Sequence, residues 1–140
     1  MDRARYPGGR RGAGALQSEG MAKVLIVDDV RSELELMKST IAALGHEVIT
    51  AADGEEAKQA IRREQPNLIL LDVVLPKING FEICRQLKQD SRLRKIPVIL
   101  VSGKSTKADI FWGKKQGADE YLPKPVRPEE LLQLVQRYLV

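Results

Sequence analysis

The sequence predicts a doubly wound α/β domain built around a parallel sheet. Short apolar runs rich in β-branched residues alternate with segments in which apolar residues recur every three or four positions. The alternation continues from Met21 to the end of the chain, and glycine or proline separates several of the segments. Strands that alternate with helices in this way are typical of a sheet covered by helices on both faces.

Five strands are expected. Three of them are short apolar runs bounded by polar or small residues, a pattern typical of buried parallel strands: Val24–Val27, Asn67–Leu71 and Pro97–Val101. Two weaker candidates are Val48–Ala51 and Tyr121–Leu122.

Five helices are expected between and after these strands. The first three have apolar stripes at helical spacing, formed in turn by Leu34, Met37, Ile41 and Leu44, by Ala57, Ala60 and Ile61, and by Ile83, Cys84 and Leu87. Gly45 ends the first helix and Pro66 follows the second. The fourth covers residues 106–116 and is closed by Gly117. The fifth runs from Pro128 to Leu139, with proline in the first turn, where a missing N–H costs nothing.

The predicted topology shows where to look for a functional site. A right-handed parallel sheet of this size favours the flavodoxin-like order 2-1-3-4-5. Ligands of such sheets bind at the carboxyl ends of the strands, beside the switch point between the first and third strands. Asp28 and Asp29 follow the first strand, Asp72 the third, Ser102 the fourth and Lys124 the fifth. We therefore expect these five side chains to lie at one edge of the sheet.

This combination of side chains indicates phosphoryl chemistry. Three close carboxylates repel one another unless a cation neutralises them, and oxygen ligands without clustered histidine or cysteine favour Mg²⁺. A carboxylate can also attack phosphorus and form an aspartyl phosphate. A metal ion and a lysine then stabilise the phosphoryl oxygens.

Length and composition agree with one soluble domain. The 140 residues are 43% hydrophobic and 30% charged, and no apolar stretch is long enough to span a membrane. The single cysteine, Cys84, excludes an intramolecular disulfide, and we expect a cytoplasmic protein. Residues 1–20 hold four arginines and two acids, and the other 120 residues hold 19 basic and 17 acidic side chains. The domain is therefore nearly balanced, and its charge does not predict nucleic-acid binding.

A domain boundary is expected near Met21. Residues 1–20 are rich in glycine and arginine and show no apolar periodicity, so we expect a disordered basic tail before a domain of residues 21–140. The tail also lacks the apolar centre of a signal peptide. Three origins remain open: an upstream start codon or expression remnant, a passive native tail, or a functional basic arm.

Four sequence pieces give the chain its resemblance to a known family. They are VLIVDD, LILLDVVLPKINGFE, PVILVSGK and DEYLPKP, in this order. From Met21 to Val140 the chain resembles a response-regulator receiver domain of the chemotaxis-regulator type.

The resemblance implies a role for each site residue. Asp72 would be the phosphoacceptor, and Lys124 would bind the phosphate. Asp29 would bind Mg²⁺ directly, Asp28 through water, and the backbone carbonyl of Val74 would be a further ligand. The switch would consist of Ser102, the hydroxyl that moves to the phosphate, and Tyr121, its aromatic partner.

The resemblance also implies a signalling function rather than enzymatic turnover. A sensor histidine kinase or a histidine phosphotransfer protein would supply the phosphoryl group. The face formed by the fourth helix, fifth strand and fifth helix would then bind a downstream protein. The chain ends at Val140, directly after the fifth helix, so we expect no fused output domain. We also expect a monomer or weak dimer and no contact with a membrane. The segment around Trp112 resembles regulators of type IV pilus (twitching) motility.

Structural alternatives remain open at each position. Asp29 could simply cap the first helix, while Asp72, Ser102 and Lys124 could be ordinary turn residues. Tyr121 could be a half-buried strand-end tyrosine. For two other residues a structural role is expected: His46 at the surface and Cys84 in the core. Trp112 could be either a binding hot spot or part of the core.

Functional alternatives remain as well. The chain could be an intermediate phosphate carrier in a phosphorelay, or a pseudo-receiver that binds partners without phosphorylation. A haloacid-dehalogenase-like phosphatase would need a second aspartate, which Asp72-Val73-Val74 lacks. A nucleic-acid binder that uses the basic tail would lose its salt-dependent binding when residues 1–20 are deleted.

Overall fold

The computed structural model describes residues 21–139 of the chain. The predicted tail, residues 1–20, lies outside the described residues, as does Val140. Strands and helices alternate along the whole described part: β1 Lys23–Val27, α1 Arg31–Ala42, β2 Glu47–Ala51, α2 Gly54–Glu64, β3 Leu68–Leu71, α3 Gly80–Gln89, β4 Val98–Ser102, α4 Lys107–Lys115, β5 Glu120–Pro123 and α5 Pro128–Leu139.

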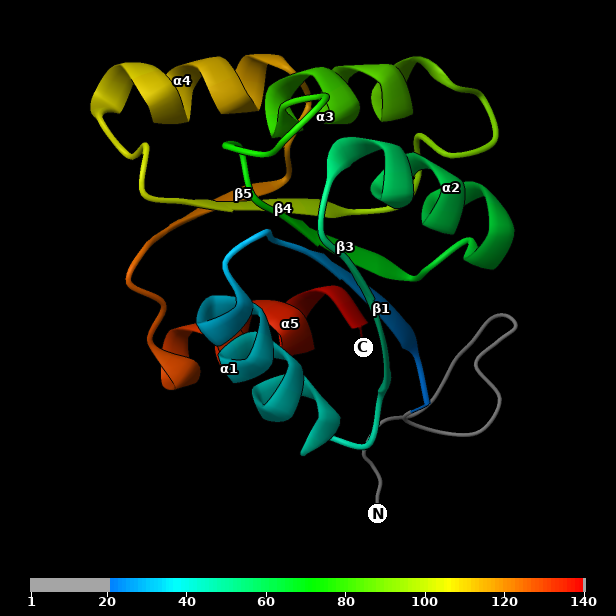
Figure 1. Cartoon of the computed structure of the whole chain (residues 1–140), viewed down its shortest axis with the longest axis vertical. Coiled ribbons are helices and arrows are strands. Elements are labelled where there is room, and N and C mark those ends of the chain that lie inside the picture. The colour runs from blue at the N-terminus through cyan, green and yellow to red at the C-terminus, as the bar shows by residue number, and fades with distance from the viewer. Residues whose placement is uncertain (1–20, 140) are drawn as a thin grey trace.

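The strands form one parallel sheet in the order β2-β1-β3-β4-β5, as predicted. Helices α1 and α5 cover one face, and α2, α3 and α4 cover the other (Figure 1). Each predicted strand and helix is present, with ends within a few residues of expectation. Among the described residues, no helix has the length and apolar character needed to cross a membrane.

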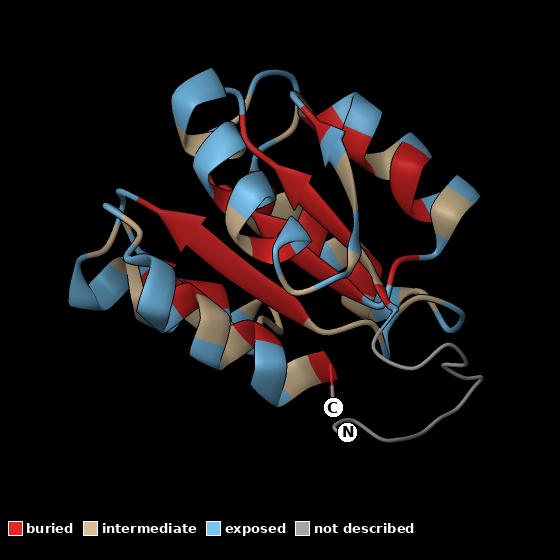
Figure 2. Ribbon diagram, turned by 90° about the horizontal axis from the view of Figure 1, so that it is seen from below, coloured by how far each residue is buried: buried red, intermediate tan, exposed pale blue. Residues whose placement is uncertain are grey.

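The strand residues divide the core into two halves because successive side chains point to opposite faces. Toward α2 and α3, the sheet contributes Leu25, Val27, Ile69, Leu71, Val98 and Leu100. Toward α1 and α5, it contributes Val24, Ile26, Leu68, Leu70, Ile99 and Val101. Figure 2 shows the buried strands between helices whose outer surfaces are exposed. Burial on both faces explains why the central strands are continuous apolar runs.

The core includes Cys84, which is fully buried on α3 as predicted. Burial raises the pKa of its thiol to about 11, so the side chain stays protonated near neutral pH. The single histidine, His46, lies in the loop before β2. Its Nδ1 accepts a hydrogen bond from the Ala22 N–H at 3.1 Å. Neither residue approaches the carboxyl ends of the strands.

Candidate functional site

The backbone brings the acidic residues together at the carboxyl end of the sheet. β1 and β3 are neighbours, and Val27 is in register with Leu71. The next residues, Asp28 and Asp72, therefore leave adjacent strands side by side. Their N–H groups donate to the carbonyls of Ala51 and Val27 at 3.1 and 3.0 Å, so the strand pairing continues through them.

Three carboxylates form the centre of the site. Asp28, Asp29 and Asp72 each place one carboxylate oxygen within 4.8 Å of the others. Asp28 and Asp72 are buried, whereas Asp29 is exposed. The residue that caps α1 is Val30, which offers no side-chain hydrogen bond, so Asp29 does not take the capping role left open by the sequence.

Lys124 crosses the site from the loop after β5. Its N–H donates to the Ser102 carbonyl at 3.0 Å, and its peptide bond to Pro125 is cis. The ammonium donates to Asp72 Oδ2 at 2.9 Å. It also lies 2.9 Å from Asp28 Oδ2. Burial disfavours the charged lysine, but the neighbouring carboxylates of Asp72, Glu33 and Asp28 outweigh this effect and raise the pKa of Lys124.

Asp28 retains an unsatisfied oxygen. Its Oδ1 accepts the Val30 N–H at 2.9 Å, while the buried Oδ2 makes an ion pair with Lys124 but no hydrogen bond. Burial raises the pKa of Asp28 more than its hydrogen bonds and Lys124 lower it. A buried carboxylate oxygen beside two other carboxylates is the arrangement that a hard cation would stabilise.

Val74 contacts the site through its backbone. Its N–H donates to Asp72 Oδ1 at 3.2 Å, and its side chain is exposed. This bond orients Asp72 so that Oδ2 faces Lys124.

Ser102 and Tyr121 are joined through one residue of the β4–α4 loop. The buried Ser102 Oγ accepts the Lys104 N–H at 3.2 Å. The Tyr121 hydroxyl donates to the Lys104 carbonyl. Desolvation and the nearby Asp109 raise the pKa of Tyr121, so the phenol remains a donor. The two predicted switch residues therefore contact opposite sides of the same backbone segment.

Glu33 is a site residue that the sequence did not reveal. It lies in the first turn of α1, and its Oε1 accepts a hydrogen bond from Lys124 Nζ. An acid in the first turn of a helix is common because it interacts favourably with the helix dipole. The only available signal was its position four residues after Asp29, which places it one turn from the acidic pair.

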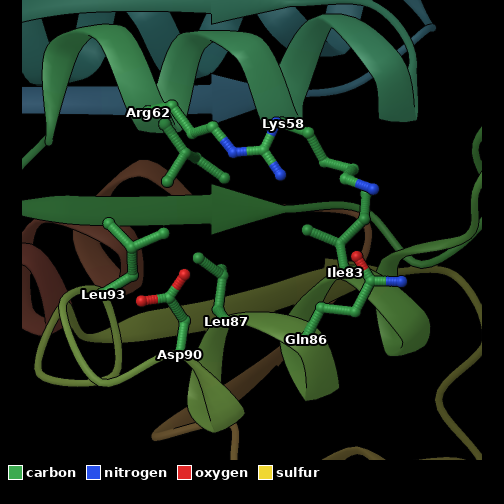
Figure 3. Close-up of a pocket in the computed structure, with 8 residues that line it drawn as sticks. Lys58, Arg62, Ile83, Gln86, Leu87, Asp90 and Leu93 are labelled. Atoms are coloured by element: carbon green, nitrogen blue, oxygen red, sulfur yellow. The ribbon is translucent and has the colours of Figure 1, made fainter.

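A small hollow lies elsewhere, between α2 and α3 (Figure 3). Its volume is about 50 Å³, and it is lined by Lys58, Ile61, Arg62, Ile83, Gln86, Leu87, Asp90 and Leu93. Sites for organic ligands are usually at least about 300 Å³. The hollow shares no residue with the acidic site, so the chemistry is concentrated at the strand ends.

Comparison with known families identifies the domain. Residues 24–136 match the family model of the response regulator receiver domain. The chain belongs to the response regulator receiver family. Receiver domains are phosphoacceptor signalling switches rather than enzymes, and they work with histidine kinases in two-component signalling. The triad of Asp28, Asp29 and Asp72 is typical of a receiver Mg²⁺ site.

Individual relatives agree with this assignment. Protein PilH of Pseudomonas aeruginosa is 41% identical over 119 residues, which cover 85% of this receiver chain and 98% of PilH. The chemotaxis response regulator CheY4 of Vibrio cholerae is 36% identical, with a TM-score of 0.79 over 85% of this chain and 99% of that one. A putative response regulator from Chloroflexus aurantiacus is 33% identical, with a TM-score of 0.81 over 84% and 97% of the two chains.

Proposed function

We propose that this receiver domain is switched by phosphorylation of Asp72, with a partner histidine kinase or histidine phosphotransfer protein as the donor. One observation carries the proposal: the Asp72 carboxylate lies at the end of β3, hydrogen-bonded to the Lys124 ammonium and grouped with two further carboxylates. A buried nucleophile beside a fixed cation is suited to accept an anionic group.

The transfer is a simple displacement at phosphorus. A carboxylate oxygen of Asp72 attacks the phosphorus of the donor's phosphohistidine, and the phosphorus–nitrogen bond breaks. The electron pair of that bond stays on the imidazole nitrogen, and Asp72 becomes an acyl phosphate. Lys124 stabilises the charge on the phosphoryl oxygens because its ammonium already lies within hydrogen-bond distance of Asp72.

The residues fit a resident Mg²⁺ ion. Asp28, Asp29 and Asp72, with the backbone carbonyl of Val74, would hold it, and the unsatisfied Asp28 Oδ2 supports this ligand set. When bound, the ion neutralises negative charge on the carboxylates and on the incoming phosphoryl group.

The output follows from Ser102, Tyr121 and the loop between them. Ser102 would move toward the new phosphoryl oxygens and release the Lys104 N–H, and Tyr121 would reorient with the loop. The face of α4, β5 and α5 would then change its affinity for a downstream protein. Phe111 and Trp112 on α4 are 64% and 52% exposed, which supports a contact role for this helix.

Sequence similarity favours a motility pathway for this switch. The segment around Trp112 resembles regulators of type IV pilus motility, and the identity to PilH is consistent with a similar role. We therefore propose a chemotaxis-like phosphorelay that acts on motility as the setting for this switch.

Intact-protein mass spectrometry tests the proposal. The wild type is incubated with acetyl phosphate or phosphoramidate, in the presence of either Mg²⁺ or EDTA. Asp72→Asn is treated in the same way. The matched control is Asp90→Asn, which loses the same charge away from the site. We expect one phosphoryl adduct on the wild type and on Asp90→Asn, in Mg²⁺ only, and none on Asp72→Asn. No adduct from either donor, together with no beryllofluoride binding, would favour a phosphorylation-independent receiver.

A further inference from the structure

The Lys124 ammonium is shared among three carboxylates of different exposure. The side chains of Asp28 and Asp72 are 0% and 5% exposed, whereas that of Glu33 is 41% exposed. Glu33 therefore contacts the ammonium from the solvent side of the site, which we take to be the entrance for a phosphoryl donor.

Glu33 also changes the charge of the site. Asp28, Asp29, Asp72 and Glu33 carry four formal negative charges, and Lys124 carries the one positive charge among these five side chains. The phosphoryl donors of such a site are anions, and so is the product. A carboxylate at the entrance attracts a divalent cation but repels both the donor and the transferred group.

We infer that Glu33 is a positioning residue that holds the Lys124 ammonium at the entrance, strengthens cation binding and restrains phosphoryl uptake. The inference rests on the proposed phosphorylation of Asp72. In the unphosphorylated protein, Glu33 and Asp72 share the ammonium. When the phosphoryl group arrives, Lys124 exchanges the Glu33 carboxylate for phosphoryl oxygens, and the strength of the Glu33 contact limits this exchange.

The two effects of Glu33 have opposite signs, which makes the inference testable. Glu33→Gln keeps a hydrogen-bond acceptor of nearly the same size but removes the charge. It should weaken Mg²⁺ binding and, at saturating Mg²⁺, accelerate phosphorylation. Loss of packing or of helix stability would not produce this pair of changes.

The experiment compares the wild type with Glu33→Gln and with Glu35→Gln, an exposed acid on the same helix without an ion pair to a described residue. Mg²⁺ affinity is measured by isothermal titration. Phosphorylation by acetyl phosphate at saturating Mg²⁺ is followed by intact mass. For Glu33→Gln we expect Mg²⁺ affinity to fall and the phosphorylation rate to rise, each roughly three- to tenfold, with both differences smaller at high salt. Glu35→Gln should match the wild type in both measurements.

The outcomes separate this inference from the proposed function. A wild type that is phosphorylated in Mg²⁺, with Glu33→Gln no faster or with equal Mg²⁺ affinity, would overturn the role of Glu33 alone. A wild type that gains no phosphoryl group would overturn the proposed function, and the restraint on uptake with it. The Mg²⁺ titration would still decide whether Glu33 strengthens cation binding.

Discussion

At the scale of single residues, Lys124 organises the site. Its ammonium lies between Asp28, Asp72 and Glu33, and its side chain is only 12% exposed. A buried charge that loses its partner is costly, because the remaining charges are neither solvated nor paired. Lys124 therefore stabilises the fold itself, in addition to the role proposed for it toward the phosphoryl group.

Replacement of Lys124 by methionine should expose this dual role. Without Mg²⁺, we expect Lys124→Met to lower the free energy of unfolding by about 3 kcal/mol, since Asp28 and Asp72 lose their counter-charge. Added Mg²⁺ should stabilise the variant more than the wild type, because the ion then replaces the counter-charge that Lys124 supplied. Urea unfolding with and without Mg²⁺ measures both effects.

Lys95→Met is the matched control, since Lys95 is exposed and has no ion pair among the described residues. It should unfold like the wild type. If Lys124→Met were as stable as this control in the absence of Mg²⁺, the ion pairs of Lys124 would contribute nothing to the fold.

At the scale of secondary-structure elements, the start of α3 packs directly against the loop that carries Asp72. A Cβ added to Gly80 would lie 2.1 Å from the carbonyl oxygen of Asp72, and the Gly80 N–H donates to the Val73 carbonyl at 2.8 Å. Only a residue without a side chain permits this approach. The glycine therefore holds α3 close to the loop that carries Asp72.

Gly80→Ala should destabilise the domain by about 2–3 kcal/mol. The backbone must shift to accept the Cβ, and this cost exceeds the gain of up to about 1 kcal/mol that alanine offers over glycine in a helix. Thermal unfolding beside Gly103→Ala provides the check, because a Cβ at Gly103 meets nothing within 4 Å. Equal stability of the two variants would show that the loop relaxes without cost.

The N-terminus of α4 gives a pH-dependent prediction. The Thr106 hydroxyl and N–H both donate to Asp109, at 2.9 and 3.1 Å, and the Asp109 N–H donates back to the hydroxyl at 3.1 Å. The Thr106 bonds, with a smaller effect of Lys104, lower the pKa of Asp109 from its ordinary value of 3.8. The unfolded state therefore binds this proton more readily than the folded state.

The stability that Asp109 contributes is thus fully present above about pH 4 and is lost as the pH falls through its lower folded pKa. We expect wild type to exceed Asp109→Asn in the free energy of unfolding at pH 7, with the difference shrinking below pH 4. Urea unfolding from pH 7 to pH 3 measures the trend. A difference that stays constant over this range would mean that the ionised carboxylate is not what stabilises the cap.

At the scale of the whole molecule, the site and the proposed output face share the β4–α4 loop and β5. Tyr121 lies in β5 and Lys124 directly follows that strand, and Tyr121 contacts Lys104 in the loop that leads into α4. Contiguous bonded residues therefore connect Asp72 to the loop before α4, and a change at Asp72 would reach this helix along them. Trp112, the single tryptophan, is half exposed on that helix and can report the change.

Acetyl phosphate with Mg²⁺ should change the fluorescence of Trp112. We expect the change in wild type, a smaller one in Tyr121→Phe, which lacks the hydroxyl that contacts Lys104, and none in Asp72→Asn. Intact mass measured in parallel shows how much of each sample is phosphorylated. A fully phosphorylated wild type with unchanged emission would contradict transmission to α4.

Domain boundaries also belong to this scale. β1 begins at Lys23, and Ala22 is already buried with its carbonyl bonded to the Glu47 N–H at 2.8 Å. We predict that a chain beginning at Met21 unfolds at the same urea concentration as the full chain and is phosphorylated at the same rate. A lower midpoint would show that residues 1–20 contribute to the fold.

Much of the architecture was predictable because local patterns reflect it directly. The apolar runs at Val24–Val27 and Leu68–Leu71 are continuous since both faces of these strands are covered. Parallel strands end at one edge, so residues that follow them must meet there. Asp28, Asp72, Ser102 and Lys124 could therefore be assigned to one place before any distance was known.

The features that could not be predicted depend on contacts between segments that are distant in the sequence. The sequence by itself determined the order of elements and the edge of the sheet that carries the acids, because periodicity and parallel topology are local and geometric properties. Only the tertiary structure decided that Val30 rather than Asp29 caps α1, that Trp112 is exposed, and that Glu33 reaches Lys124. Glu33 and Lys124 are separated by 91 residues, and the packing of α1 beside the β5–α5 connection brings them into contact.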